Sequence, residues 1–345
     1  MSKTFIVAEL SANHGHSLEI ALASIRAIRE AGADAVKLQT YTADTLTLNS
    51  RREDFQVKGT LWDGRTLYDL YQEAFTPWEW HKALFDEARR QGLVCFSTPF
   101  DRTAVDFLEE LGNPICKIAS FEITDIPLIG YAARKGKPMV LSTGIALPED
   151  IERAVRTCRA AGNDDITLLK CTSAYPAPVE DANLRTMVDM KDRYGVKVGL
   201  SDHTTGSDVA VAAVALGAAM VEKHFILDRS IGGPDAAFSM EKDDFAAMVR
   251  AIRNVEKALG GVVYPTDPAA VKGREFSRSL YVARDMKAGD VITGENVRSV
   301  RPGYGLAPRY LPLVLGKRVC RDVQAGERFS LSLLEDPIPV SDTER

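Results

Sequence analysis

The sequence lacks an apolar run long enough to span a membrane, and it lacks a long run of basic residues. A membrane-spanning helix needs about 20 apolar residues, and nucleic-acid binding usually depends on a basic surface, so both functions are disfavoured. The net charge of −5 also gives no reason to expect nucleic-acid binding. The first residues lead directly into an apolar run, without the pattern of a signal peptide. We therefore expect a cytoplasmic protein that binds neither membranes nor nucleic acid.

Cysteine is scarce as well. The five cysteines are odd in number, and no two of them form a Cys-x-x-Cys motif. Cys95, Cys116 and Cys171 lie within apolar runs, where a buried and reduced thiol is the expected state. This pattern indicates a reducing compartment.

Apolar runs and helical patterns alternate from residue 4 to about residue 260. We expect strands at residues 5–8, 35–39, 93–97, 115–119, 139–142, 166–171, 197–200 and 220–224. We expect helices at residues 18–31, 77–91, 103–111, 148–161, 183–194, 207–216 and 242–259. Eight strand-then-helix units predict a parallel sheet that closes as a (β/α)8 TIM barrel. An open doubly wound sheet is the alternative, although no Gly-x-Gly-x-x-Gly motif follows the first strand.

Two segments depart from this alternation. Residues 41–76 are too many for an ordinary strand-to-helix loop, and their aromatic and charged content suggests that they fold over something. After residue 259 the composition shifts to a Gly-Gly pair, two prolines and then short β-like runs with turns. We therefore predict a barrel domain at residues 1–262, a linker at 263–278 and a small β-rich domain at 279–345.

Two histidines stand at the ends of consecutive predicted strands, His203 in Ser-Asp-His and His224 in Glu-Lys-His. Because strand side chains alternate, Ser201 shares a face with His203, and Glu222 shares one with His224. If the strands are parallel neighbours, both imidazoles lie at one carboxyl edge. Two imidazoles near the carboxylates of Asp202 and Glu222 suit a divalent first-row metal. The alternative is that each histidine only packs or hydrogen-bonds at its strand end.

The active site of a (β/α)8 barrel lies where its strands end. The polar residues at the predicted ends are Glu9, Lys37, Gln39, Thr98, Lys117, Ser120, Ser142, Thr143, Lys170, Ser201 and Glu222. Lysines and hydroxyls supply the charge and the donors that phosphate and carboxylate groups need. In a protein of negative net charge, three lysines at one edge predict a site for a small di- or trianion. Lysines paired as structural charges inside the barrel are the alternative.

The same motifs carry a resemblance. They are Ala8-Glu9-Leu-Ser-Ala-Asn13-His14, Lys37-Leu-Gln39-Thr, Ser97-Thr98-Pro99, Lys117-Ile-Ala-Ser120, Ser142-Thr-Gly144, Ser201-Asp-His203-Thr and Glu222-Lys-His224-Phe. In this order they resemble those of the sialic acid synthase family, which condenses phosphoenolpyruvate with amino sugars. The tail beyond Arg278 is similar to that family's antifreeze-like domain, also called SAF or β-clip. One departure is His16, which stands where the family often has glycine.

Within the family, residues 40–50 and 59–81 most resemble the branch that makes pseudaminic acid. The acceptor implied by that branch is 2,4-diacetamido-2,4,6-trideoxy-altrose. The branches that make N-acetylneuraminate and legionaminate are the alternatives.

The resemblance also implies a role for each matching residue. A divalent metal ion (Mn²⁺, Mg²⁺ or Co²⁺) is expected on His203 and His224. The residues expected to bind phosphoenolpyruvate are Lys37, Thr98, Lys117, Ser120, Ser142, Lys170 and Ser201. The expected catalytic residues are Glu9, Lys37, Gln39 and Glu222, and the expected sugar-binding residues are Asn13, Tyr175 and Arg301. Arg301 is expected to reach the sugar from the partner's small domain, in a homodimer whose small domains are swapped as lids.

Two other functions remain open at this point. A strand-end lysine such as Lys117 or Lys170 could form a Schiff base, which would make the protein a metal-independent aldolase or lyase. The antifreeze-like tail could instead be a binding module attached to an inactive barrel. The histidine pair argues against both.

Overall fold

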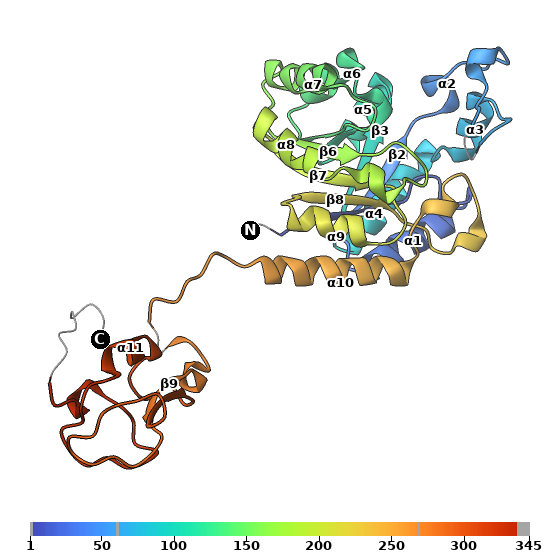
Figure 1. Ribbon diagram of the computed structural model, residues 1–345. Helices are drawn as coiled ribbons and strands as arrows, with labels where there is room; N and C mark the ends of the chain where they lie inside the picture. The colour runs from blue at the N-terminus through green and yellow to red at the C-terminus, as the bar shows by residue number, and fades with distance from the viewer. Residues whose placement is uncertain (1–2, 60–61, 268–269, 337–345) are drawn as a thin grey trace. The chain divides into compact units, whose positions relative to one another are not determined.

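Eight parallel strands form one sheet in the computed structural model, which describes residues 3–59, 62–267 and 270–336 (Figure 1). The hydrogen-bonded order is β3-β2-β1-β8-β7-β6-β5-β4, and β3 and β4 at its two ends contact each other, so the sheet closes. The strands are β1 (Phe5–Glu9), β2 (Ala35–Thr40), β3 (Val94–Pro99), β4 (Cys116–Ile118), β5 (Met139–Ser142), β6 (Ile166–Cys171), β7 (Lys197–Asp202) and β8 (Met220–His224). The predicted TIM barrel is confirmed.

Helices cover the outside of this barrel (Figure 1). They are α1 (Leu18–Glu30), α4 (His81–Arg90), α5 (Arg102–Glu110), α6 (Ile126–Ala133), α7 (Pro148–Ala160), α8 (Arg185–Tyr194), α9 (Asp208–Ala215) and α10 (Lys242–Leu259). Local sequence determines where two of these helices begin. The Asp101 carboxylate caps α5 by accepting from the Thr103 amide at 2.6 Å, and Pro148 occupies the first turn of α7. Helix α6 was not among the expected helices. Its eight residues carry no long periodic pattern.

The barrel buries two layers of apolar side chains. One layer fills the space between strands and helices, and the other lies inside the barrel, where Val7, Phe96, Val140, Leu169 and Met220 meet. Alternation along each strand separates the two layers. Side chains that point inward at the carboxyl ends therefore emerge together at one mouth, and this places the polar strand ends next to one another.

In the excursion after β2, the described residues 41–59 and 62–76 include the α-helices α2 (Ala43–Leu46) and α3 (Leu67–Ala74) (Figure 1). The Thr42 and Thr66 hydroxyls cap these helices by accepting from the amides of Thr45 and Asp69 at 3.2 and 3.0 Å. The predicted functional excursion is thus a structured element, and its position at the barrel mouth is described below.

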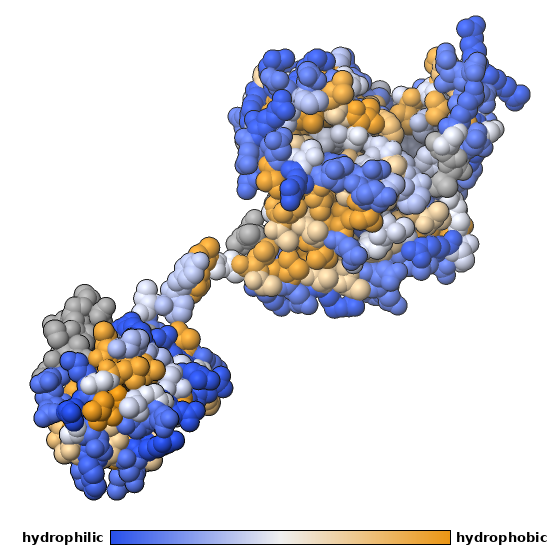
Figure 2. Space-filling view, in the orientation of Figure 1, coloured by the Kyte–Doolittle hydropathy of each residue, from blue (hydrophilic) through white to orange (hydrophobic). Residues whose placement is uncertain are grey.

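Helix α9 presents an apolar surface on the outside of the barrel unit. After Asp208, helix α9 carries no charged residue, and Leu216 at its end is 44% exposed. In the view of Figure 2, hydrophobic residues gather over this helix, while most of the surrounding surface is hydrophilic. Among the described residues, no helix is both long and apolar enough to cross a bilayer.

The chain divides into two compact units between Gly260 and Gly261. In the second unit, β9 (Ser279–Val282) pairs antiparallel with β10 (Val297–Val300), and α11 (Leu311–Val314) joins them around a separate apolar core. This arrangement fits the predicted small β-rich domain. Residues 268–269 of the predicted linker and 337–345 of the predicted domain lie outside the described residues.

Candidate active site

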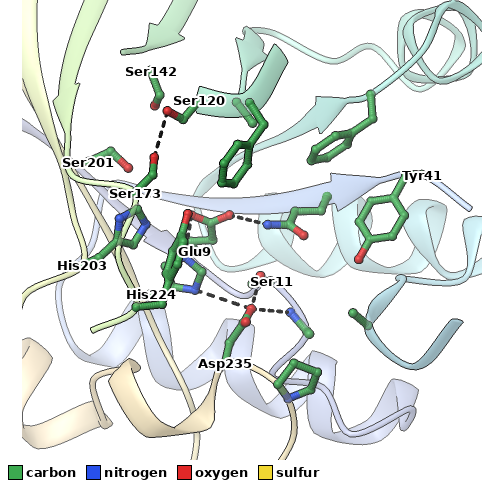
Figure 3. Close-up of a pocket in the computed structure, with 18 of the residues that line it drawn as sticks. Glu9, Ser11, Tyr41, Ser120, Ser142, Ser173, Ser201, His203, His224 and Asp235 are labelled. Carbon is green, nitrogen blue, oxygen red and sulfur yellow. Dashed lines mark hydrogen bonds and ion pairs between the residues drawn. The ribbon is translucent and has the colours of Figure 1, made fainter. Parts of the chain in front are cut away.

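Side chains from the ends of most barrel strands line one pocket of about 460 Å³ (Figure 3). The predicted site residues in its lining are Glu9, Lys37, Gln39, Lys117, Ser120, Ser142, Tyr175, Ser201, His203, Glu222 and His224. The excursion contributes a further part of the wall. Sequence positions more than 200 residues apart therefore meet at one mouth, as expected for a closed parallel barrel.

Lys37 joins two carboxylates that come from neighbouring strands. Its Nζ lies 2.9 Å from Oε2 of Glu9 and 2.8 Å from Oε1 of Glu222, and no side chain of the three is more than 4% exposed. Gln39 donates to Oε1 of Glu9 at 2.9 Å, and the Ser201 hydroxyl donates to Oε1 of Glu222 at 3.0 Å. Burial opposes ionisation, but the opposite charges prevail, so the pKa of both glutamates falls and the pKa of Lys37 rises. All three groups are charged at neutral pH.

A second wall of the pocket is rich in hydrogen-bond donors. The Lys117 ammonium donates to the Ser142 hydroxyl at 2.8 Å, and the Ser173 hydroxyl donates to the Ser120 hydroxyl at 3.0 Å. Gly144 permits this approach, because a Cβ there would lie 2.2 Å from Ser173 Oγ and 2.6 Å from Ser120 Oγ. Burial lowers the pKa of Lys117. One ammonium and several hydroxyls on one wall suit a phosphate or a carboxylate.

The two predicted metal ligands lie next to each other at the ends of the paired strands β7 and β8, with ring centroids 5.3 Å apart. Nδ1 of His203 lies 3.0 Å from the Thr172 carbonyl oxygen, which can only accept, so this nitrogen donates and, in the neutral ring, Nε2 carries the lone pair. Nε2 of His224 lies 3.3 Å from Oε2 of Glu9. Nδ1 of His224 is buried without a hydrogen-bond partner and lies 3.8 Å from Oδ2 of Asp235.

The surroundings of these imidazoles decide whether they can hold a divalent cation. Within the part of the chain that the structure describes, no three His, Cys, Asp or Glu side chains form a complete metal-binding group. Burial lowers the pKa of His224 and so favours the neutral ring that binds metals. Burial also opposes protonation of His203, but the Cys171 thiol and the Thr172 carbonyl raise its pKa. Two imidazoles fit an open site that water or substrate completes, and the metal stays a prediction.

Aromatic rings enclose the histidine pair. The Tyr175 ring lies 4.5 Å from His203, and the Phe238 ring lies 5.0 Å from His224. Trp62 of the excursion approaches Tyr175 at 5.9 Å between ring centroids. These rings restrict water around the imidazoles, which strengthens electrostatic interactions at that end of the pocket.

Comparison with known proteins agrees with this geometry. The NeuB family profile matches residues 24–264, and the SAF domain profile matches residues 277–335. The first match covers more than half of the chain. The chain belongs to the NeuB family.

Curated relatives in this family span almost the whole chain. The pseudaminic acid synthase of Campylobacter jejuni subsp. jejuni serotype O:23/36 is 49% identical over 330 residues, which are 96% of this chain and 96% of the relative. The pseudaminic acid synthase of Helicobacter pylori is 49% identical over 331 residues, 96% of this chain and 97% of the relative. The N,N'-diacetyllegionaminic acid synthase of Campylobacter jejuni serotype O:2 is 36% identical over 95% of this chain and 99% of the relative.

A solved structure shows the same architecture. The N-acetylneuraminic acid synthetase from Leptospira borgpetersenii, solved in complex with citrate, superposes with a TM-score of 0.70 at 31% identity. The match covers 78% of this chain and 89% of that chain. A sialic acid synthase fold, predicted from the motifs, is therefore confirmed.

Four of the site residues that the resemblance implies lie outside the pocket lining: Asn13, Thr98, Arg301 and Lys170. Thr98 is 1% exposed, and its hydroxyl is buried without a hydrogen-bond partner. Asn13 is fully buried, and its amide donates to the Phe225 carbonyl at 2.9 Å and to the Ser239 hydroxyl at 2.8 Å. Asn13 therefore holds its loop in place. Arg301 is an exposed residue of the second unit.

Two predicted placements are corrected. The Lys170 ammonium does not line the pocket, and it donates to the Cys171 carbonyl at 2.9 Å and to the Thr172 hydroxyl at 3.2 Å. The Asp202 carboxylate pairs with Lys223 at 2.6 Å, away from the histidines, and neither side chain is more than 2% exposed. The physical reason is strand alternation: Cys171, one position after Lys170, points into the pocket instead.

Several lining residues were missed by the sequence reasoning. Glu122 lies in a 3-10 turn two residues after Ser120, its Oε2 has no hydrogen-bond partner, and burial raises its pKa to about 7. Asp235 lies in the irregular segment after β8 and accepts from the Ser11 hydroxyl at 2.5 Å. The spacing from Ser120 could have identified Glu122, whereas no periodic signal marks Asp235.

Proposed function

We propose that this protein condenses phosphoenolpyruvate with 2,4-diacetamido-2,4,6-trideoxy-altrose and water to give pseudaminic acid and inorganic phosphate. The observation that supports it best is one pocket that holds a donor-rich wall, a buried Lys37 paired with two glutamates, and two neighbouring imidazoles. The relatives named pseudaminic acid synthase, 49% identical over nearly the full chain, favour this acceptor. Legionaminic acid synthesis is the second candidate, from relatives at 36% identity.

Phosphoenolpyruvate would bind at the donor-rich wall. Lys117 supplies positive charge, and the hydroxyls of Ser120 and Ser142 supply donors for the phosphate and carboxylate oxygens. Ser201 and Lys37 lie on the same side of the pocket through their shared contacts with Glu222. In a buried pocket such preorganised charge is worth more than it is in water.

Carbon 3 of phosphoenolpyruvate attacks the open-chain aldehyde of the acceptor, water adds at carbon 2, and phosphate leaves as its bond to carbon 2 breaks. His203 and His224 would hold the divalent cation, which supplies Lewis acidity to the aldehyde when bound. Glu9 is ionised and accepts from Gln39, so it can take a proton from the attacking water. Glu222 is the other candidate, because it is ionised and contacts both Lys37 and Ser201.

A Schiff-base aldolase is the competing chemistry, and one observation favours it. Burial lowers the pKa of Lys117, which is what a nucleophilic lysine requires. Incubation with both substrates and borohydride tests this: the condensation releases phosphate and leaves no adduct, whereas a covalent adduct on Lys117 would support the aldolase and contradict the proposed function. An inactive barrel that serves only as a binding module would release no phosphate.

We also propose a homodimer in which the second unit of one subunit covers the barrel mouth of its partner and Arg301 reaches the sugar. An exposed arginine in a small unit with its own core is available for such a contact. Mixed dimers of a His203→Ala subunit and an Arg301→Ala subunit, each inactive alone, should regain activity, because one site then carries neither lesion. Activity that stays lost would contradict the exchange.

The protein is proposed to work in the cytoplasm. Cys95, Cys116, Cys158 and Cys171 are free and buried, as expected in a reducing compartment. Labelling of the native protein with a thiol reagent, before and after unfolding, should show Cys95, Cys116 and Cys158 protected and then reactive as reduced thiols.

A further inference from the structure

Helix α3 turns its apolar face toward a cavity instead of toward the barrel core. Leu67, Leu70, Tyr71 and Ala74 follow the i, i+3, i+4, i+7 spacing of one helical face, and all four line the active-site pocket. An amphipathic helix normally buries this face against its own protein. Here Ala74 packs with Ala12 and Tyr41 in a small apolar cluster, and the rest of the face borders the pocket.

Neighbouring side chains extend this apolar surface. Tyr41 packs edge-on against Phe100 and Tyr71, with centroid distances of 5.1 and 5.8 Å, and Val57 lines the same pocket at 9% exposure. Leu70 is 6% exposed, so protein atoms cover most of its side chain and only a small part of it borders the pocket. The pocket therefore has a polar half, formed by the strand ends, and an apolar half, formed mainly by the excursion.

Two contacts fasten the excursion to the barrel loops. The indole of Trp62 donates to the Pro234 carbonyl at 3.1 Å, next to the pocket residue Asp235. The His16 ring contacts the Glu73 carbonyl at 2.6 Å, near the end of α3. These contacts come from different loops, so they fix the apolar half relative to the polar half.

We propose that Leu70 and Val57 determine acceptor specificity by packing against the deoxygenated end of the sugar, including its C6 methyl group. This inference rests on the proposed function. The acceptor has a methyl group at carbon 6 and an acetamido group at carbon 4, where N-acetylmannosamine has hydroxyl-bearing groups. A hydroxyl placed against these side chains loses its hydrogen bonds to water without a replacement.

The test compares two acceptors that differ in one oxygen atom: the 6-deoxy sugar and 2,4-diacetamido-2,4-dideoxy-altrose, which has a hydroxymethyl group. The measured quantity is the ratio of kcat/KM for the two acceptors. We expect the native protein to prefer the deoxy sugar at least about tenfold, which is the usual value of one group in an apolar pocket. Leu70→Asn should reduce that ratio about tenfold, mainly through KM for the deoxy sugar, with KM for phosphoenolpyruvate unchanged.

Leu48→Asn is the matched control, because Leu48 lies in the same excursion, is 66% exposed and does not line the pocket. It should keep the native ratio. If Leu70→Asn does not fold, Val57→Thr is nearly the same size and should reduce the ratio about threefold.

A folded Leu70→Asn or Val57→Thr protein with the native ratio would overturn this inference alone, and so would a Leu48→Asn protein that lost the ratio to the same extent. Absence of phosphate release from the native protein with the deoxy acceptor would overturn the proposed function and this inference together.

Discussion

The ammonium of Lys37 lies 2.8 Å from a carboxylate oxygen of Glu222, and both side chains are buried. The same ammonium pairs with Glu9 at 2.9 Å, so removal of Lys37 would leave two buried carboxylates without their shared partner. We expect Lys37→Met to lower the free energy of unfolding by about 3–5 kcal/mol, as measured by denaturant titration at pH 7.

Lys170→Met is the control, because this lysine is only partly buried and its ammonium contacts a carbonyl and a hydroxyl. Lys170→Met should lower the free energy of unfolding clearly less than Lys37→Met does. Equal stability of the Lys37→Met and native proteins would mean that the two glutamates are not ionised.

Glu122 predicts a pH dependence of stability. Its pKa is about 7 in the folded protein against 4.5 for an unperturbed glutamate, because burial disfavours its charge. The folded state therefore binds more protons than the unfolded state between these values, so the free energy of unfolding falls as pH rises through this window, by up to about 3 kcal/mol. Glu122→Gln should remove that decrease. Denaturant titrations of both proteins at pH 5 and pH 8 would show it, and identical pH dependence would refute it.

The lysines of β4 and β6, Lys117 and Lys170, should differ in their effect on phosphoenolpyruvate binding. Lys117 lines the pocket and Lys170 does not. Lys117→Met should lower kcat/KM for phosphoenolpyruvate at least about 100-fold, because it removes a charged donor from a buried anion site. Lys170→Met should have little effect. Steady-state phosphate release checks both variants, and equal losses would show that the anion does not bind at the donor-rich wall.

Metal removal and histidine substitution should have the same effect. We expect a strong chelator to abolish turnover, and His203→Ala or His224→Ala to abolish it without unfolding the barrel. Titration of Mn²⁺ into the chelated protein, followed by calorimetry, should show binding to the native protein and none to either variant. Full turnover by metal-free protein would contradict the role of this histidine pair.

The sequence predicted the barrel and much of its mouth, because strand alternation is a local rule with long-range consequences. His203 and His224 could be placed together from their positions at two strand ends, and they lie 5.3 Å apart between ring centroids. Lys170 was assigned to the wrong face of its strand, and Asp202 was counted near the histidines although alternation with Ser201 and His203 places it on the opposite face. A strand's last residues do not reveal which parity faces inward when both positions are polar.

Other parts of the site could not be predicted from short stretches of the sequence. Asp235 reaches the pocket from an irregular segment that has no periodic pattern. The length of the excursion predicted an element with a function, but the apolar face of α3 could equally have packed on a core. Only the folded chain shows that Leu70 faces the cavity.

The most direct measurement is a competition among acceptors. The protein, a divalent metal and limiting phosphoenolpyruvate are incubated with equal concentrations of 2,4-diacetamido-2,4,6-trideoxy-altrose, N-acetylmannosamine and the legionaminate precursor, and the nine-carbon products are separated by chromatography. We predict that pseudaminic acid forms almost exclusively, with one phosphate released for each molecule of product. Predominant N-acetylneuraminate or legionaminate would contradict the proposed acceptor, and absence of all three products would contradict the condensation itself.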